Sequence, residues 1–346
     1  MNPYMAYEAV NTKIMTRIGQ VLNTEKLNKI LDFSTVDQLI DYIKDQDIVK
    51  RMPQNHKIDN INRDSLESLL GIFKTNEIED MIHYFSGPYK DFIKSMLIDS
   101  EIADITLILR KIARGESLSD INKRFVHSEK YTSIEFDKLI GSKSIENFTQ
   151  NLKDTPYYIG LRNLSNDDAI NREFHIEMKL QGVFYKTLLS KAEKLNKEDM
   201  ETAKDIIGHK IDLENIQWIY RALRYYDISP EEILIYSLEG GKKIGYSRLK
   251  SLCYVKSSEE FKQLVTEYLK YNIFEGIAES DTDIGIDYNM YKYLKNKHYK
   301  NIGSCISYVI ILGIIIDDLS AITEGIKYNM PREKLMEYLA YRNLTN

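Results

Sequence analysis

The sequence predicts an all-α protein made of three similar helical-bundle domains. Apolar residues recur at helical spacing along most of the chain, and no stretch alternates with period two for long enough to predict a strand. Helix-breaking residues are scarce, since the 346 residues include only 6 prolines and 16 glycines, about half the usual combined share. Two helix patterns also occur three times each in the same order, which indicates an internal repeat. We therefore predict three domains at residues 1–120, 121–236 and 237–346, each large enough to bury its own core.

The first repeated pattern is an apolar stripe that is clearest in residues 211–233, IDLENIQWIYRALRYYDISPEEI. Its apolar positions recur at helical spacing, which places them on one helix face. The stripes consist of Ile105, Ile108, Leu109 and Ile112; Ile216, Ile219, Tyr220 and Leu223; and Leu319, Ile322, Thr323 and Ile326. A short polar residue precedes each stripe (Asp104, Asn215 and Asp318), and a charged residue lies five positions into it (Arg110, Arg221 and Glu324). We predict that the stripes are the buried faces of three helices in equivalent places.

The second repeated pattern is a helix start. KSIENFTQNL at 143–152 matches KSSEEFKQLV at 256–265, and STVDQLIDYI at 34–43 is a weaker copy. Each copy has a Ser or Thr followed by an acid within the first turn. The hydroxyl can accept a hydrogen bond from an unpaired backbone N–H, and the acid faces the positive end of the helix dipole. We therefore predict helix starts at Thr35, Ser144 and Ser257.

Periodicity and breakers divide the rest of the chain into further helices. Gly115 closes the helix of the first stripe, Gly240-Gly241 forms a loop at the start of the third domain, and Pro331 suits the first turn of the last helix. The other expected helices cover about 6–22, 24–31, 35–47, 65–73, 77–85, 134–140, 144–153, 168–195, 197–211, 246–252, 257–271 and 287–297.

Composition limits the classes of function. The formal net charge of −5 argues against nucleic acid as a general partner, because phosphate binding needs a net basic face. Two cysteines, Cys253 and Cys305, make no disulfide framework and suit a reducing cytoplasm. The start MNPYMAYEAVNTK lacks the features of a signal peptide. Residues 301–316 carry no charge, but their strongly apolar part, 308–316, is shorter than the roughly 20 residues of a membrane span, so we predict a buried core helix.

No set of residues predicts a catalytic, cofactor-binding or metal site. Asp317-Asp318 lacks the third acid, at +4 from the first, of an all-α terpenoid synthase, since that position is Ala321. Asp281, Asp283 and Asp287 do not match a calcium loop, because Gly285 occupies an oxygen-ligand position. Gly240-Gly241-Lys242-Lys243 lacks the upstream glycine and the hydroxyl of a phosphate loop; a helix end is the better interpretation of the preceding LEGG. The six histidines show no metal spacing. We therefore predict a non-catalytic protein without a cofactor.

The ordered set of motifs resembles one family, the C subunits of the prokaryotic A/V-type ATPases, which are the counterparts of the d subunit of the vacuolar enzyme. The resemblance covers nearly the whole chain. Its pieces are the opening Tyr7, Asn11, Lys13 and Ile14; the stretches Asp104 to Arg110 and Asn215 to Arg221; the turn at 238–241; and the segment Ser320 to Leu335. The chain departs from the family pattern at Gly313 and Ile315, where acids are usual, and at Glu324, where the other two repeats have Arg.

The resemblance implies a funnel of three similar domains with pseudo-threefold symmetry and no enzymatic activity. Such a protein belongs to the central stalk of a rotary complex that moves protons or sodium ions. It lies peripherally on the cytoplasmic face of the membrane and links the central axle to the ring of proteolipid subunits. The alternative is a helical scaffold unrelated to ion transport. Copurification with axle and ring subunits would separate the two.

Overall fold

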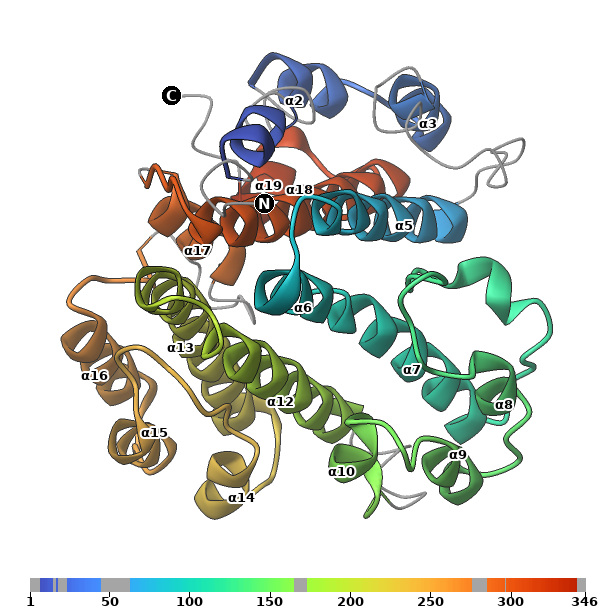
Figure 1. The fold of residues 1–346 in the computed structure, drawn as a ribbon. Helices are drawn as coiled ribbons and strands as arrows, with labels where there is room; N and C mark the ends of the chain where they lie inside the picture. The colour runs from blue at the N-terminus through green and yellow to red at the C-terminus, as the bar shows by residue number, and fades with distance from the viewer. Residues whose placement is uncertain are drawn as a thin grey trace. The chain divides into compact units, whose positions relative to one another are not determined.

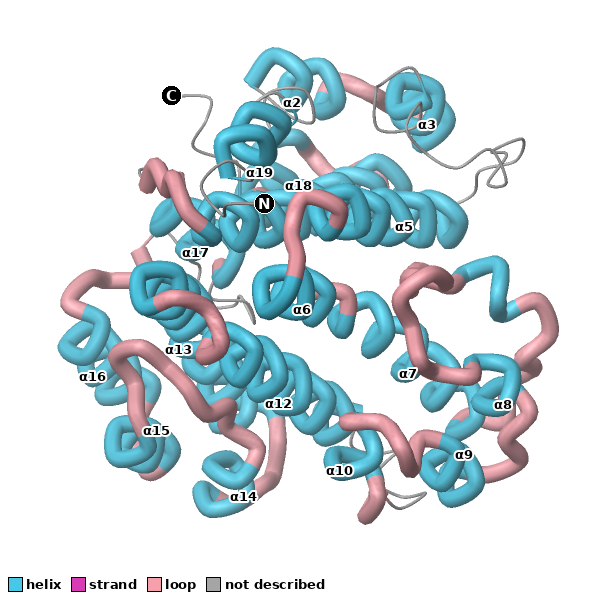
Figure 2. The backbone as a smooth tube through the Cα atoms, viewed as in Figure 1, coloured by secondary structure: helices cyan, strands magenta, loops and turns pink. Residues whose placement is uncertain are grey.

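The computed structural model describes residues 7–14, 17, 24–44, 63–164, 173–275, 285–295 and 297–340, and this part of the chain is helical without a strand. Figure 2 shows helices joined by loops throughout it. The predicted all-α class is therefore confirmed. The funnel arrangement of three domains stays a prediction.

The chain divides into two compact units, which are drawn in Figure 1. Unit 1 comprises Met1–Ile93, Arg124–Val126 and Asp287–Asn346, and unit 2 comprises Lys94–Lys123 and His127–Ile286. Unit 1 contains α2 (Thr24–Leu31), α3 (Val36–Lys44), α5 (Arg63–Ile82), most of α6 (Gly87–Ser95), most of α17 (Ile286–Leu294), α18 (Ile302–Lys327) and α19 (Arg332–Tyr338). Unit 2 contains α7 (Ile98–Ala113), α8 (Phe136–Ile140), α9 (Ile145–Asn151), α10 (Tyr157–Leu161), α12 (Glu173–Ala192), α13 (Lys197–Tyr225), α14 (Pro230–Ile235), α15 (Tyr246–Cys253) and α16 (Ser258–Leu269), and the short 3-10 helix η1 spans Ile121–Arg124. The predicted division into 1–120, 121–236 and 237–346 follows the repeats and stays a prediction.

The three predicted helix starts are confirmed. The hydroxyls of Thr35, Ser144 and Ser257 accept hydrogen bonds from the backbone N–H three residues later, at the start of α3, α9 and α16. Four residues after each cap lies a fully buried side chain: Leu39, Phe148 and Phe261. The repeat in the sequence is therefore a repeat of local structure.

The stripes are largely buried, as predicted. All four residues of the α18 stripe, and the first three of the α7 and α13 stripes, have buried side chains. The prediction is wrong for Leu223, which is exposed, and Ile112 is only half-buried. Both residues lie in the last turn of their helix.

Truncating the buried side chains of the α13 stripe should destabilise the protein. Ile216 and Ile219 are fully buried, so changing either to Ala should lower the free energy of unfolding by about 2–5 kcal/mol. Leu223→Ala, in the same stripe but exposed, is the matched control and should change it by less than about 1 kcal/mol. Denaturant unfolding measures all three; equal effects at buried and exposed positions would contradict the assigned burial.

Two helices are longer than the sequence predicted. Residues 65–73 and 77–85 were expected as separate helices, but α5 runs through Lys74, Thr75 and Asn76 without a break. The expected helix 197–211 and the following stripe likewise form one helix, α13, of 29 residues. None of the joining residues is a proline, and packing against neighbouring elements overrides their modest helix propensity.

Candidate functional site

The short polar residues that precede the stripes form three equivalent clamps. Asp104 accepts the backbone N–H of His127 at 2.8 Å, and Asp318 accepts that of Ala340 at 2.9 Å. Asn215 accepts the N–H of Leu238 at 2.7 Å and donates to the Leu238 carbonyl at 2.9 Å. The partners lie 23, 23 and 22 residues after the polar residue. In every repeat, therefore, one buried polar side chain fixes the backbone that returns after the polar break.

In all three repeats, the chain between the two residues of a clamp passes through the same order of elements. The stripe helix ends, a break follows, a short helix forms, and the chain then returns to the start of the stripe. The short helices are η1, α14 and α19. In the middle repeat, Ser229 caps α14 through the N–H of Glu232, and the Trp218 indole donates to the Ile233 carbonyl at 3.0 Å. The polar residues that precede the stripes (Asp104, Asn215 and Asp318) are thus the groups that hydrogen-bond the two ends of each helix–break–helix unit together.

The loop with the paired glycines lies directly against α13. The N–H of Lys242 donates to the carbonyl of Gly208 at 3.1 Å, and Asp212 accepts from the N–H groups of Lys243 and Ile244 at 2.7 and 3.0 Å. The predicted helix end at LEGG is wrong, because α14 already ends at Ile235 and Tyr236 caps it. The glycines instead allow a close approach of loop and helix: a Cβ at Gly241 would lie 2.3 Å from Asp212 Oδ1 and 2.8 Å from the Ile244 carbonyl.

Gly241→Ala should therefore destabilise the protein. The added methyl group must displace Asp212 or the loop backbone, and overpacking of this kind costs about 1–3 kcal/mol. Gly182, within α12, is the matched control, since a Cβ there meets nothing within 4 Å. Gly182→Ala should stabilise by about 0.5–1 kcal/mol, because Ala is the better helix former. Thermal melts measure both, and a Gly241→Ala melting temperature at or above that of the wild type would contradict the described loop.

Asp212 is a buried acid within this contact. Burial raises the pKa of its carboxyl to about 6, against the opposing effect of the two backbone N–H groups and of Lys242 and Lys243. The side chain is fully buried. Its geometry serves the loop, since both oxygens accept backbone hydrogen bonds.

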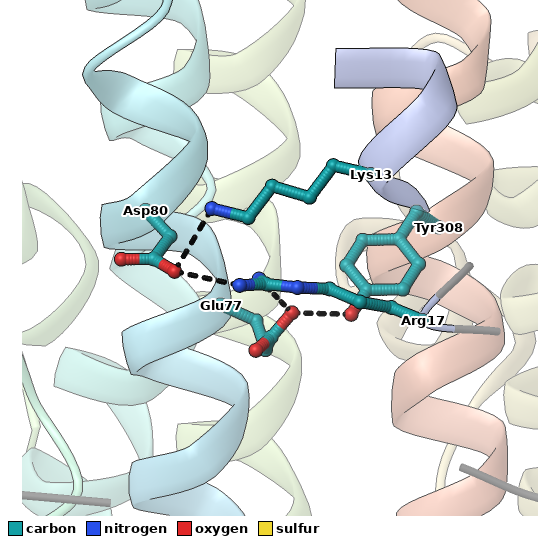
Figure 3. Close-up of polar contacts among 5 residues, drawn as sticks. All are labelled: Lys13, Arg17, Glu77, Asp80 and Tyr308. Atoms are coloured by element: carbon teal, nitrogen blue, oxygen red, sulfur yellow. Dashed lines mark hydrogen bonds and ion pairs between the residues drawn. The ribbon is translucent and has the colours of Figure 1, made fainter. Parts of the chain in front are cut away.

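A network of charged residues ties Lys13 and Arg17 to α5 and α18 within unit 1 (Figure 3). Arg17 forms an ion pair with Glu77 and another with Asp80, the second at 2.9 Å. Lys13 also pairs with Asp80, at 3.1 Å. The hydroxyl of Tyr308, on α18, donates to the same Glu77 oxygen that Arg17 contacts. One buried carboxylate therefore joins Arg17 to α5 and α18.

Burial divides this network into an inner and an outer pair. The side chains of Arg17 and Glu77 are 11% and 3% exposed, whereas those of Lys13 and Asp80 are 29% and 48% exposed. Burial alone would raise the pKa of Asp80, but hydrogen bonds and charge from Arg17 and Lys13 outweigh it and lower that pKa. Glu77 was not among the residues singled out from the sequence. A signal for it exists, because this acid lies at helical spacing after Leu70 and Phe73, on the apolar face of α5.

Some of the motifs that were rejected as catalytic or metal sites lie in the described part of the chain and have a structural role or a known position there. Asp318, of the Asp317-Asp318 pair, is the clamp of the third repeat. Asp281 and Asp283 lie outside the described residues. Within the described part of the chain, no group of three or more His, Cys, Asp or Glu side chains is placed to hold a metal ion. Cys253 and Cys305 are buried free thiols. The predicted lack of catalytic, cofactor-binding and metal-ligating residues stays a prediction.

The apolar run at 301–316 belongs to a longer helix than expected. Among the described residues, α18 is the one helix whose length and composition would allow it to cross a membrane, and half of its most apolar window is buried inside the protein. It packs against α3, α5 and α19. Ile302, Cys305, Leu312 and Ile315 of this helix are at most 1% exposed. One face of the apolar run therefore lies in the core, as the sequence predicted.

Comparisons with known proteins match nearly the whole chain. The family described as ATP synthase (C/AC39) subunit matches residues 10–338, which include the polar residues of all three clamps. The A-type ATP synthase C subunit of Archaeoglobus fulgidus is 23% identical over 95% of this chain and 94% of its own length. Its counterpart from Methanosphaera stadtmanae is 22% identical over 97% and 88%, and that from Methanosarcina mazei is 20% identical over 80% and 74%. The chain belongs to the family of ATP synthase (C/AC39) subunits.

Proposed function

We propose that this chain is a non-catalytic rotor component of an A/V-type ATPase that links the central axle to the proteolipid ring in the membrane. The observation that carries the proposal is the family match over nearly the whole chain, including all three repeats. In this role the chain lies peripherally on the cytoplasmic face of the membrane and contacts it through the ring. The complex uses ATP to move protons or sodium ions, or runs in reverse.

The internal frame suits the transmission of torque. A rotor adapter must resist twisting, and a helix–break–helix unit closed by a buried hydrogen bond resists the separation of its parts. Three such units occur in sequence, with clamps at Asp104, Asn215 and Asp318. Three similar units in a pseudo-threefold funnel would give a wide end for a ring and a socket for an axle.

Copurification from solubilised membranes tests the proposal. Tagged chain should bring down the axle and ring subunits of a rotary ATPase in constant ratio. Because the proposed docking uses charged and polar surface groups, recovery should fall as the salt concentration of the wash rises. Recovery of the chain with other partners and without any ring component would instead support the scaffold alternative.

A further inference from the structure

The end of α17 and the loop before α18 carry positive charge that no nearby acid in the sequence balances. Between Asp287 and Asp317 the chain has no acidic residue, although the whole chain has a formal net charge of −5. Four lysines lie in this interval, and we call them the basic surface: Lys292, Lys295, Lys297 and Lys300. The charge of this stretch is therefore opposite in sign to that of the chain as a whole.

The lysines of α17 lie away from its buried face. Met290 and Leu294 are 0% and 2% exposed, and their spacing of four residues places them on one face of the helix. Lys292 and Lys295 are three residues apart on the other face, and both are exposed, as is Lys300 in the loop. Among the residues that the structure describes, these three lysines form no ion pair. Their charges are therefore available to a partner.

Tyrosines lie between the lysines of the basic surface. The Lys297 ammonium lies 3.7 Å from the centroid of the Tyr293 ring on α17 and 5.9 Å from that of the Tyr299 ring in the loop. A cation near an aromatic ring is attracted by the quadrupole of the ring, so Lys297 helps to hold the loop against the helix. Both tyrosines are half-buried. The basic surface thus combines ammonium groups with amphipathic rings.

The use of lysine indicates the chemistry of the partner. The interval between Asp287 and Asp317 contains no arginine. Recognition of carboxylates favours the planar fork of arginine, and protein–protein interfaces are enriched in arginine and depleted in lysine. A lysine ammonium acts instead as a point charge that attracts phosphate without a fixed geometry. Tyrosine is enriched at the boundary between lipid headgroups and acyl chains. A lipid surface with anionic headgroups therefore fits both residue types.

We propose that the basic surface, with the tyrosines that lie between its lysines, binds the anionic headgroups of a membrane directly. The cytoplasmic face of a membrane has a negative surface potential, which attracts basic residues within a short distance of it. The inference goes beyond the proposed function, in which the chain contacts the membrane through the ring.

Sedimentation of the intact purified chain with lipid vesicles tests the proposal. Vesicles of equimolar phosphatidylglycerol and phosphatidylcholine should carry the chain into the pellet at low salt, whereas vesicles of phosphatidylcholine alone should not. High salt should release the chain, because ions screen the attraction. These vesicles contain no proteolipid ring, so the result does not depend on the proposed link between axle and ring.

A triple variant identifies the lysines that bind. Lys292→Gln, Lys295→Gln and Lys300→Gln together remove the three exposed charges and keep Lys297, which contacts the tyrosines. The affinity of this variant for the anionic vesicles should fall about a hundredfold, the loss expected for three lysines close to a charged membrane. Its melting temperature should stay that of the wild type, since the three side chains form no ion pair among the described residues.

The matched control replaces three exposed lysines that already pair with acids. It changes the net charge by the same amount, and it should bind the anionic vesicles as the wild type does. Its changes are Lys123→Gln, Lys138→Gln and Lys197→Gln, at positions that pair with Asp120, Glu135 and Glu201.

Three results would overturn the proposal. One is equal binding of the wild type to both kinds of vesicle. Another is an equal loss of affinity in the two triple variants, which would assign the binding to net charge instead of to the basic surface. The third is a wild-type chain that does not bind the anionic vesicles, together with loss of copurifying axle or ring subunits in the first triple variant. The basic surface would then bind an acidic protein.

Discussion

A reconstituted rotary complex that lacks this chain should lose ATP-driven ion pumping, while the detached soluble motor should hydrolyse ATP at its normal rate. The reason is mechanical: a linker between axle and ring carries torque and takes no part in nucleotide chemistry. The measurement compares ion uptake into vesicles and ATP hydrolysis, with the chain present, omitted and added back. Adding it back should restore pumping.

Two outcomes would contradict this expectation. Pumping that survives complete removal of the chain would show that axle and ring couple without it. ATP hydrolysis by the purified chain alone would show a catalytic site that the sequence does not predict. A Leu223→Ala chain, changed at one exposed side chain, is a suitable add-back control for the handling of the protein.

Arg17→Met should lower the free energy of unfolding by about 3–5 kcal/mol, the usual cost of removing one side chain of a buried ion pair. Glu77 is 3% exposed on its side chain and accepts hydrogen bonds from Arg17 and Tyr308. Without Arg17, this carboxylate keeps the Tyr308 hydrogen bond but loses the positive charge that faces it in a poorly solvated place. Denaturant unfolding at neutral pH measures the loss.

Lys13→Met is the matched control in the same network. Its partner Asp80 is 48% exposed, and exposed ion pairs contribute roughly 0–1 kcal/mol. The control should therefore change stability far less than Arg17→Met. Equal losses at the two positions would mean that burial does not divide the network drawn in Figure 3 into an inner and an outer pair.

The repeated features were predictable from the sequence because they depend on local rules. A hydroxyl followed by an acid identified the caps at Thr35, Ser144 and Ser257, since capping involves atoms only three residues apart. The stripes followed from helical spacing. The clamp residues Asp104 and Asn215 were noticed as polar positions before the stripes, but their partners lie 23 residues away. Sequence spacing alone does not reveal a contact of that kind.

Packing between residues far apart in the chain could not be predicted from the sequence for the same reason. Glu77 and Tyr308 are 231 residues apart, and no local pattern connects them. The continuity of α5 and α13 also depends on neighbours, which override the weak break signals within each helix. The sequence identified the paired glycines as a loop. It did not show why glycine is needed there, which is that the loop lies close against Gly208 and Asp212 of α13.

The most direct test of the linking role is a sedimentation measurement with three purified parts. Vesicles that contain only the proteolipid ring are mixed with the axle protein, with or without this chain, and then pelleted. The axle should pellet with the vesicles only when the chain is present, and high salt should release it. An axle that pellets equally well without the chain, or that stays in solution with it, would contradict the proposal that this chain joins axle to ring.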